Sequence, residues 1–413
     1  MHVVMFGDQH AETLGGAQVS MRLQRRFLEK AGHTVTMVAP AMHGARGRAV
    51  PADPAYVDLP SVPITVDREY SMSWPGRRTD RRLDAWFLNL SKDRSRPPVD
   101  VVHVQADFWG AFIGHRFARR HGLPVVHTMH NRVDVGIEAT APFPGLVLRV
   151  LNAWQRTALG SEATGSDGWA YLRGLAAGAS AVTAPSSHFA RRLEQHRVFP
   201  GVDVIWNGID DDLLDEALSS TEEARIPERP RFVWLGRMSP EKRLLPFLEA
   251  VAASGIDADV EVIGGGGQLR AARRLVERTR PRATVRFAGR MPYAETLRRI
   301  AAADAVVQTS IGFETQGMTI FEAASLGTPA VVSDPDLGAE LGSGFWPVGD
   351  AGAFDRGEAD PSVAALADAL RAAASDIAAG APRQPDPSIR ERFRQSSRTA
   401  AMIEVYERVT ARR

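Results

Sequence analysis

The sequence begins His2-Val-Val-Met-Phe6, a strand-like run, and continues through a glycine-bearing turn, Leu14-Gly-Gly-Ala17. A helical segment from about Gln18 to Ala31 follows the turn, and a second strand-like run covers Thr34 to Val38. Short, continuous apolar strands that alternate with longer helices are typical of a parallel sheet covered by helices on both faces. This opening stretch therefore predicts an α/β fold built on a parallel sheet.

The same alternation recurs along the chain. With 413 residues the chain is too long for one compact core, so two domains are expected. An Asn-Gly turn signal after a short strand, at about Val204 to Ile209, predicts the boundary between a domain of residues 1–205 and one of residues 206–389. The charged Glu222 to Pro230 run is expected to be an exposed connector, and residues 41–99 to be surface loops. Further strands are predicted at Val101 to Val104, Val125 to Thr128, Ala181 to Ala184, Phe232 to Leu235, Val260 to Ile263, Val285 to Ala288 and Ala305 to Gln308.

Composition excludes several classes of site. The chain contains no cysteine, so disulfides, thiolate metal sites and a cysteine nucleophile are ruled out. Neither a signal-peptide pattern at Met1 to Phe6 nor an apolar run of about 20 residues is present, so a cytoplasmic protein is expected. Residues 1–200 carry 24 Lys and Arg against 17 Asp and Glu, whereas the remainder carries 26 against 32. Halves of opposite charge suggest different partners for each half.

Two motifs are suited to binding a phosphate group. Gly15 and Gly16 stand between the first strand and a helix, where backbone amides favour anions, although a tight turn would also require glycine. Arg237 follows a strand in Leu235-Gly-Arg237, and Lys242 comes five residues later. Two cations at the end of a strand can hold a diphosphate, although a solvated surface pair would have the same sequence.

Two glutamates, Glu314 and Glu322, are separated by seven residues. A helix that starts near Gly317 would direct the amides of Gly317, Met318 and Thr319 toward a phosphate, with one carboxylate before the helix and one within it. The carboxylates could accept hydrogen bonds from sugar and ribose hydroxyls, although glutamates beside an apolar helix are usually solvated.

Two histidines, His127 and His130, stand at the carboxyl end of the predicted strand Val125-Val-His-Thr-Met-His130. This edge is where open α/β sheets carry their active-site groups. A histidine at such a place is also often a packed, hydrogen-bonded residue of the core.

In this order, the motifs resemble the retaining GT-B glycosyltransferases of glycosyltransferase family 4. The resemblance includes Asn207-Gly-Ile-Asp210, and its most specific part is Phe313-Glu-Thr-Gln-Gly-Met-Thr-Ile-Phe-Glu322, followed by Gly327-Thr-Pro329. It implies two Rossmann-like domains whose parallel sheets face each other across a cleft, with a C-terminal helix, residues 390–413, packed back on the N-terminal domain.

The resemblance also implies roles for individual residues in a donor site. A nucleotide diphosphate sugar, linked to UDP or GDP, is the expected substrate, and a hexose is the group transferred. Arg237 and Lys242 are implied to neutralise the diphosphate, Glu322 to bind the ribose and Glu314 to bind the hexose. The loop of Gly15 and Gly16 is implied to approach the diphosphate, and His130 to lie near the donor sugar. The backbone around Arg290 and Met291 is implied to contact the base.

The resemblance implies catalysis without a cofactor or a dedicated metal site. Retention of configuration is expected to follow front-face attack, with the leaving phosphate taking the acceptor proton. Asp334-Pro-Asp336 spells D-x-D, a metal motif of another glycosyltransferase fold, but Pro335 would hinder the usual ligand geometry. Relatives often have Gly-Gly where this chain has Asp336-Leu-Gly338, so that loop supports no inference about ligand contacts.

A membrane lipid is the favoured acceptor. Glu314-Thr-Gln-Gly317 and the His-Thr-x-His strand end look like those of bacterial diacylglycerol and phosphatidylinositol glycosyltransferases, although Asn131 to Asp134 departs from their pattern. A basic N-terminal half suits an enzyme lying peripherally on the anionic inner face of a membrane.

The alternatives are a soluble sugar or secondary metabolite as acceptor and, more remotely, a nucleotide-sugar epimerase of the same fold. No nucleic-acid partner is expected. The candidate membrane contacts are Arg77 to Arg82, Arg116 to Arg120 and Phe143 to Trp154.

Overall fold

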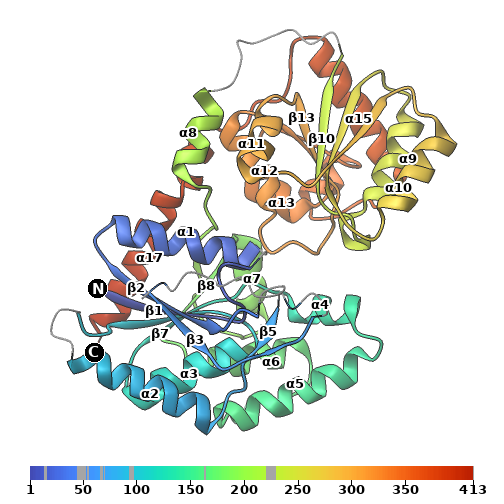
Figure 1. Cartoon of the computed structure of the whole chain (residues 1–413). Coiled ribbons are helices and arrows are strands. Elements are labelled where there is room, and N and C mark those ends of the chain that lie inside the picture. Colours follow the sequence, from blue (N-terminus) through green and yellow to red (C-terminus); the bar gives the residue numbers. More distant parts are fainter. Residues whose placement is uncertain are drawn as a thin grey trace. The chain divides into compact units, whose positions relative to one another are not determined.

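The computed structural model describes residues 1–13, 16–43, 53, 55–65, 68, 70–92, 97–161, 164–219 and 229–412. Gly15 and residues 222–228 of the expected connector lie outside the described residues. The chain divides into two compact units (Figure 1). Unit 1 comprises Met1–Gly208 and Gln395–Arg413, and unit 2 comprises Ile209–Arg394, whereas the sequence predicted boundaries after residues 205 and 389.

The described part of unit 1 is built on a seven-stranded sheet in the order β3-β2-β1-β6-β7-β8-β9, and all its strand pairs are parallel. A short antiparallel pair, β4 with β5, lies outside this sheet. The strands are β1 His2–Gly7, β2 Thr34–Pro40, β3 Tyr56–Leu59, β4 Val62–Pro63, β5 Ser71–Met72, β6 Val101–Gln105, β7 Val125–Thr128, β8 Ala181–Ala184 and β9 Asp203–Val204.

Alternate side chains of the unit 1 strands face two separate cores, as the two-residue period of a strand requires. Val3 and Met5 of β1 pack with the core under α1 and α17, whereas Val4 and Phe6 pack with the core under the helices of the other face. Figure 1 shows α1 and α17 on one side of this sheet and α2, α3 and α5 on the other. The helices are α1 Gly16–Lys30, α2 Arg77–Lys92, α3 Trp109–His121, α4 Val133–Thr140, α5 Pro144–Leu159, α6 Gly168–Ala176, α7 Ser187–Gln195 and α17 Gln395–Thr410.

The expectation of surface loops throughout residues 41–99 is wrong. α2 spans sixteen residues of this segment, from Arg77 to Lys92. Its Leu83 and Leu90 are buried, and Trp86 and Phe87 pack against the same core. The spacing of these four residues is that of an amphipathic helix, so the helix forms because it can bury this stripe on α3.

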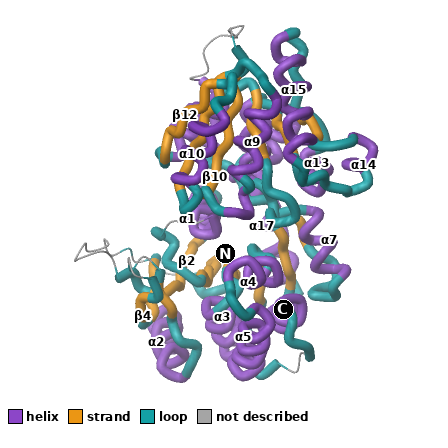
Figure 2. The backbone as a smooth tube through the Cα atoms, turned by 90° about the vertical axis from the view of Figure 1, so that its right-hand side faces the viewer, coloured by secondary structure: helices purple, strands orange, loops and turns teal. Residues whose placement is uncertain are grey.

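Unit 2 is also built on a parallel sheet. Over its described residues this sheet has six strands, in the order β12-β11-β10-β13-β14-β15. α9 contacts both α10 and α15, and α9 and α10 lie side by side in Figures 1 and 2. Its strands and helices are α8 Asp211–Ser219, β10 Arg231–Arg237, a 3₁₀ turn Pro240–Lys242, α9 Leu244–Ser254, β11 Asp259–Gly265, α10 Leu269–Thr279, β12 Thr284–Gly289, α11 Tyr293–Ala301, β13 Ala305–Gln308, α12 Met318–Leu326, β14 Ala330–Val332, α13 Pro335–Leu341, β15 Phe345–Pro347, α14 Ala351–Asp355, α15 Val363–Ala378 and α16 Ser388–Phe393.

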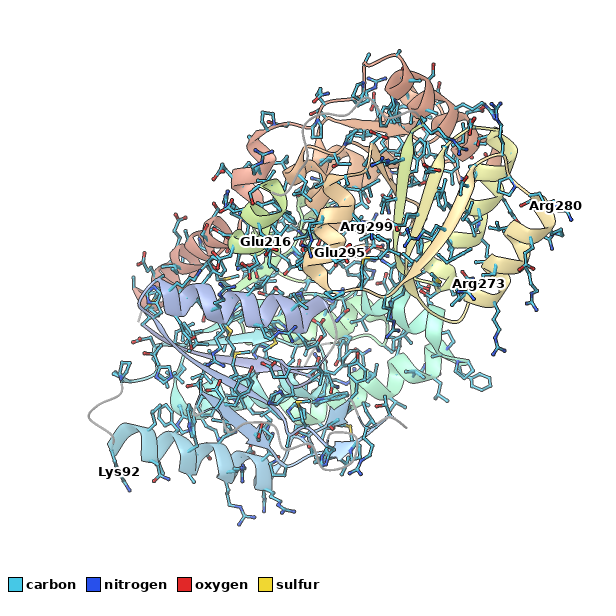
Figure 3. The ribbon with its side chains drawn as sticks, turned by 45° about the horizontal axis from the view of Figure 1, so that its top comes forward. Lys92, Glu216, Arg273, Arg280, Glu295 and Arg299 are labelled. Atoms are coloured by element: carbon cyan, nitrogen blue, oxygen red, sulfur yellow. The ribbon has the colours of Figure 1, made fainter. Side chains whose placement is uncertain are left out.

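Charge is not spread evenly over unit 2. Arg273 and Arg280 project outward from α10 and the residue after it (Figure 3), and both side chains are exposed. On α11, Arg299 pairs with Glu295 at 2.9 Å between Nε and Oε1, and Arg298 lies 3.9 Å from Glu216 of α8. The second half of the chain therefore has an acidic surplus overall, although its helix α10 is basic and exposed. Among the described residues, no helix combines the length and the apolar character that a membrane crossing needs.

Candidate active site

Lys242 and Glu314 form an ion pair at the carboxyl edge of the unit 2 sheet. Lys242 ends the 3₁₀ turn that follows β10, and Glu314 lies in the loop that follows β13. Because β10 and β13 are parallel neighbours, their carboxyl ends bring the two loops together. Ser310 donates to Glu314 Oε1 at 2.7 Å, and Lys242 Nζ lies 5.8 Å from the centre of the Phe313 ring. The ammonium and the carboxylate are thus held at one place before α12 begins.

Arg237 is the last residue of β10 and is far more exposed than Lys242. Its side chain is 72% exposed, against 22% for Lys242. Its nearest charged partner is Glu241, at 3.4 Å, and Ser239 also donates to Glu241. Arg237 is therefore a largely solvated cation at the end of β10, whereas Lys242 is held in its ion pair.

The amino terminus of α12 opens directly after this loop. Gly317 precedes the helix with φ of 74°, a left-handed conformation that disfavours residues with a side chain. A Cβ at this position would lie 2.7 Å from Leu337 Cδ1, so a larger residue would also force the Leu337 side chain to move. The following amides, of Met318 and Thr319, belong to the first turn of α12, where amides lack partners within the helix. This turn can receive an anion.

Glu322 is buried within α12 and accepts a hydrogen bond from Tyr293. The distance from the Tyr293 hydroxyl to Glu322 Oε1 is 2.6 Å. Burial raises the pKa of Glu322, and the Tyr293 bond opposes that rise. Tyr293 opens α11, and sequence reasoning missed it because a lone tyrosine at the start of a helix has no distinctive pattern.

A glycine-rich turn, Gly264 to Gly267, adjoins the same sheet edge and was also missed. A Cβ at Gly264 would lie 2.0 Å from the carbonyl oxygen of Gly236, so only glycine lets β10 and β11 end this close together. Arg290 lies beside this turn, since a Cβ at Gly265 would be 3.3 Å from Arg290 Nε. Met291 follows it and is half-buried. The sequence signal for the turn was the run of four glycines itself.

Asp334 and Asp336 of the D-x-D sequence have structural partners. Asp334 caps α13 by accepting from the amide of Asp336 at 3.0 Å, and it accepts from the amide of Gly312 at 2.7 Å. Asp334 therefore secures the loop that carries Glu314. Over the described residues, no cluster of three or more histidines and carboxylates has the arrangement of a metal site.

Unit 1 has a pocket of about 340 Å³ at the carboxyl edge of its own sheet. Gly16 and His130, two residues singled out in the sequence, both line it. His130 Nε2 lies 3.3 Å from Gln105 Oε1, and burial lowers the pKa of His130 to about 4, so the ring is neutral at physiological pH. The remaining lining residues are Asp8, Gln9, Ala17, Gln18, Gln105, Ala106, Asp107, Phe108, Trp109 and Asn131.

Asp8 and Asp107 form the acidic wall of this pocket. Asp8 follows β1 and accepts from the amides of Asp107 and Gly110, each at 2.8 Å. Asn131 donates to Asp107 at 2.6 Å. Burial raises the pKa of Asp8 to about 6 and that of Asp107 to about 7. Their role in joining the loops after β1, β6 and β7 depends on contacts that the sequence does not reveal.

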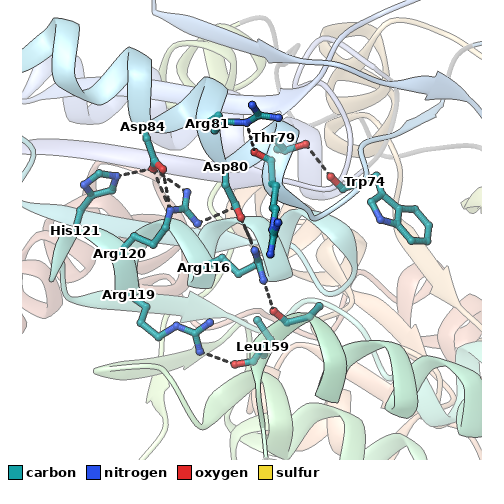
Figure 4. A network of polar contacts seen from close by, with 12 residues as sticks. Trp74, Thr79, Asp80, Arg81, Asp84, Arg116, Arg119, Arg120, His121 and Leu159 are labelled. Atoms are coloured by element: carbon teal, nitrogen blue, oxygen red, sulfur yellow. Dashed lines mark hydrogen bonds and ion pairs between the residues drawn. The ribbon is translucent and has the colours of Figure 1, made fainter.

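Three arginines of the candidate membrane contact Arg116 to Arg120 have partners within unit 1. Arg116 and Arg120 of α3 both pair with Asp80 of α2, and Arg120 also pairs with Asp84 (Figure 4). Arg119 donates to the carbonyl of Leu159 at the end of α5. These arginines join three helices. By contrast, the side chains of Arg77, Arg78, Arg81 and Arg82 are exposed along α2.

The predicted residues thus fall into one group in each unit. In unit 2 the structure brings together Lys242 and Glu314 next to the first turn of α12, with Glu322 in the same helix, while Arg290 and Met291 follow β12. In unit 1, Gly16 and His130 share a pocket, and the other glycine of the loop, Gly15, is not described.

Comparisons with known proteins agree with this organisation. Residues 14–213 match the family model "Glycosyltransferase Family 4", and residues 217–341 match "Glycosyl transferases group 1". The chain is 24% identical over 343 residues to alpha-monoglucosyldiacylglycerol synthase of Streptococcus pneumoniae, covering 80% of this chain and 70% of that protein.

Solved structures show the same fold at low sequence identity. HepE of Anabaena, solved in complex with UDP, superposes with a TM-score of 0.65 at 16% identity, over 99% of this chain and all of that one. Sucrose-phosphate synthase of Thermosynechococcus elongatus gives a TM-score of 0.64 at 17% identity, with both chains fully covered. The two family matches together span most of the chain, which therefore belongs to the glycosyltransferases of family 4 and has the GT-B fold.

Proposed function

We propose that this glycosyltransferase transfers a hexose, with retention of configuration, from a UDP- or GDP-linked sugar to a hydroxyl group of a membrane lipid. The observation that carries the proposal is the Lys242–Glu314 pair next to the first turn of α12. It provides a fixed cation and helix amides for a diphosphate, and a carboxylate for sugar hydroxyls, at one edge of one sheet.

The donor is expected to lie along the carboxyl edge of the unit 2 sheet. Lys242, Arg237 and the α12 amides would hold the diphosphate, and Glu314 would accept from hydroxyls of the hexose. Glu322, oriented by Tyr293 through Oε1, would accept from the ribose. The backbone near Arg290 and Met291 would contact the base. HepE of Anabaena was solved with UDP, which supports a uridine nucleotide as the first donor to test.

Retention would follow from attack on the face that the leaving group departs from. The bond between the anomeric carbon and the diphosphate oxygen breaks, the acceptor oxygen bonds to that carbon, and the acceptor proton passes to the departing phosphate. Negative charge grows on the diphosphate during this step, so the preorganised Lys242 and the α12 amides stabilise the transition state. No protein nucleophile and no cofactor enters the proposed reaction.

A lipid acceptor is supported by an exposed apolar face on unit 1. Phe143, Leu146 and Val150 are 70%, 61% and 58% exposed, and they follow one face at the start of α5. Trp74, which precedes α2, is also exposed and stacks on Trp154 of α5 with ring centres 5.3 Å apart. α3, α4 and α5 lie together in Figure 2. The name of the pneumococcal relative, a glycolipid synthase, supports the same acceptor class.

The exposed arginines of α2 would add electrostatic attraction to this surface. Arg77, Arg78 and Arg81 are exposed on α2, and Lys92 extends from its far end (Figure 3). Each basic residue near an anionic leaflet contributes about 1 kcal/mol. We therefore infer peripheral binding to the inner face of the membrane through the apolar face of α5 and the basic face of α2.

Co-sedimentation with phosphatidylglycerol vesicles tests this membrane surface. Wild type is expected to bind at low salt and to be released as salt rises, because screening acts within about 8 Å at physiological ionic strength. Leu146→Glu with Val150→Glu should abolish binding, whereas Val204→Glu, on the edge strand β9, should leave it unchanged. If the Leu146→Glu, Val150→Glu variant bound vesicles as well as Val204→Glu does, the apolar face of α5 would be excluded as the membrane contact.

A donor and acceptor panel tests the proposed reaction. UDP- and GDP-hexoses are incubated with diacylglycerol or phosphatidylinositol in vesicles, with soluble sugars, or with no acceptor, and nucleotide release and labelled lipid are measured. Label in the lipid extract supports the proposal. Transfer to soluble sugars alone would favour the soluble-acceptor alternative, and interconversion of the nucleotide sugar without transfer would favour an epimerase.

A further inference from the structure

A chain of buried side chains connects the pocket residue His130 to the C-terminal helix of unit 1. His130 Nε2 lies 3.3 Å from Gln105 Oε1, and Gln105 Nε2 contacts Gln24 Oε1. Gln24 Nε2 lies 3.2 Å from the hydroxyl of Tyr406, which lies 2.6 Å from Nδ1 of His103. The chain thus links α17, α1 and β6 to the histidine after β7. It is built into the core, because the four residues beyond His130 are all buried.

The glutamine amide atoms assign a direction to three of the four hydrogen bonds that join His130 to His103. An amide nitrogen only donates and an amide oxygen only accepts. His130 therefore donates from Nε2 to Gln105, Gln105 donates to Gln24, and Gln24 donates to the oxygen of Tyr406. The single hydroxyl hydrogen of Tyr406 is then directed to Nδ1 of His103.

The far end of the chain has the same direction. With Nδ1 of His103 accepting, the ring proton lies on Nε2, which is 2.7 Å from Thr128 Oγ1. Thr128 in turn lies 2.6 Å from Thr183 Oγ1. Burial lowers the pKa of His103 to about 3, so this ring stays neutral and has only one proton to place.

We propose that Tyr406 is a positioning residue for His130. Acting through Gln24 and Gln105, it determines which ring nitrogen of His130 carries the proton and in which direction the ring points. Because the Tyr406 hydrogen is committed to His103, its oxygen can only accept, so Gln24 must present its amide nitrogen. Gln24 then presents its oxygen to Gln105, and Gln105 presents its oxygen to His130. The chain holds His130 in the Nε2–H form, which leaves Nδ1 as the accepting nitrogen.

Without the Tyr406 hydroxyl, nothing in this chain of hydrogen bonds would prevent the side-chain amides of Gln24 and Gln105 from rotating by 180°, which exchanges their oxygen and nitrogen atoms. A turned Gln105 would present its nitrogen to His130 Nε2, which would then have to accept, and the proton would move to Nδ1. The inference rests on the proposed function only in giving His130 a place beside the reacting sugar. The tautomer itself can be read without any substrate.

The test is the tautomer of His130 in full-length protein labelled with ¹⁵N-histidine, read from two-bond ¹H–¹⁵N NMR spectra. His130→Asn assigns the signal. Wild type is expected to show one form, Nε2–H. Tyr406→Phe keeps the buried ring and should give a mixture or the Nδ1–H form. Met402→Leu, a core change on the same helix without a polar atom, should retain the wild-type form.

Gln24→Met provides a second, independent interruption of the chain and should change the tautomer as Tyr406→Phe does. In the donor assay, both variants should lower kcat by roughly five- to tenfold, the factor that one net hydrogen bond represents, with donor KM unchanged. An unchanged His130 tautomer in both folded variants would overturn the proposal. Because the spectrum needs no substrate, it decides the positioning of His130 even if sugar transfer fails its own test.

Discussion

Replacing Lys242 by alanine should remove the fixed cation of the proposed donor site. The ammonium pairs with Glu314 beside the Phe313 ring, and the Lys242 side chain is only 22% exposed, so its field would reach a bound diphosphate with little reorganisation. Losing one preorganised group of this kind typically costs about 3 kcal/mol, or roughly 100- to 1000-fold in kcat. Arg237→Ala should cost less, because the Arg237 side chain is 72% exposed and its charge is more strongly screened.

The effect should appear in catalysis and not in stability. The Lys242 and Glu314 side chains keep 22% and 18% of their surface exposed, and ion pairs that still contact solvent contribute about 1 kcal/mol or less to folding. Initial rates with saturating nucleotide sugar give kcat, and calorimetric unfolding gives Tm as the control. Lys242→Arg, which keeps the charge, should recover part of the rate. Near-normal kcat in folded Lys242→Ala would refute the assignment of the diphosphate to this edge of the sheet.

Three further outcomes are expected. Titration calorimetry should find that Glu322→Gln weakens binding of the free nucleoside diphosphate, whereas Glu314→Gln spares that binding and damages transfer; the reverse pattern would exchange the two roles. Tyr293→Phe should also weaken nucleotide binding, because it removes the hydrogen bond that orients Glu322, and unaltered affinity would remove Tyr293 from the site. Because the folded pKa of Asp107 is raised to about 7 from an unfolded value of about 3.9, its contribution favours folding at low pH and is lost as pH rises from about 4 through 7. Asp107→Asn should make the urea midpoint of unfolding less dependent on pH between about 4 and 7. An unchanged pH dependence would show that another group causes it.

Local pattern was sufficient to predict most of the parallel strands. Val125–Thr128, Ala181–Ala184 and Ala305–Gln308 have the predicted bounds. These strands are buried on both faces, so each is a short apolar run with sharp ends. The helix start beside Gly317 was also predictable, since a glycine that precedes an apolar helical segment is a local signal.

α2 shows where composition misled the reading. Its buried residues, Leu83 and Leu90, have helical spacing, but the neighbouring arginines and prolines gave the segment the composition of a loop. The ion pairs of the α3 arginines were likewise not predictable from local sequence. Arg116 and Arg120 look like a basic surface in sequence, and only the packing of α2 against α3 brings Asp80 to them.

The candidate site was predictable where one loop or helix start carries it, and not where it depends on tertiary contacts. Glu314 and Lys242 were found as separate motifs, and their ion pair needed the parallel pairing of β10 with β13. Tyr293 and Glu322 are 29 residues apart, and no periodicity relates them. The chain from His130 to Tyr406 involves residues from both ends of the sequence, joined only because α17 packs on α1.

The anomeric configuration of the product tests the central claim most directly. Purified full-length protein is given an α-linked nucleotide hexose with lipid vesicles, and the extracted glycoside is examined by ¹H NMR while released nucleoside diphosphate is quantified. We predict an α-linked glycolipid formed in equal amount to the nucleoside diphosphate. A β-linked product, or consumption of the nucleotide sugar without any glycoside, would contradict the proposed retaining transfer.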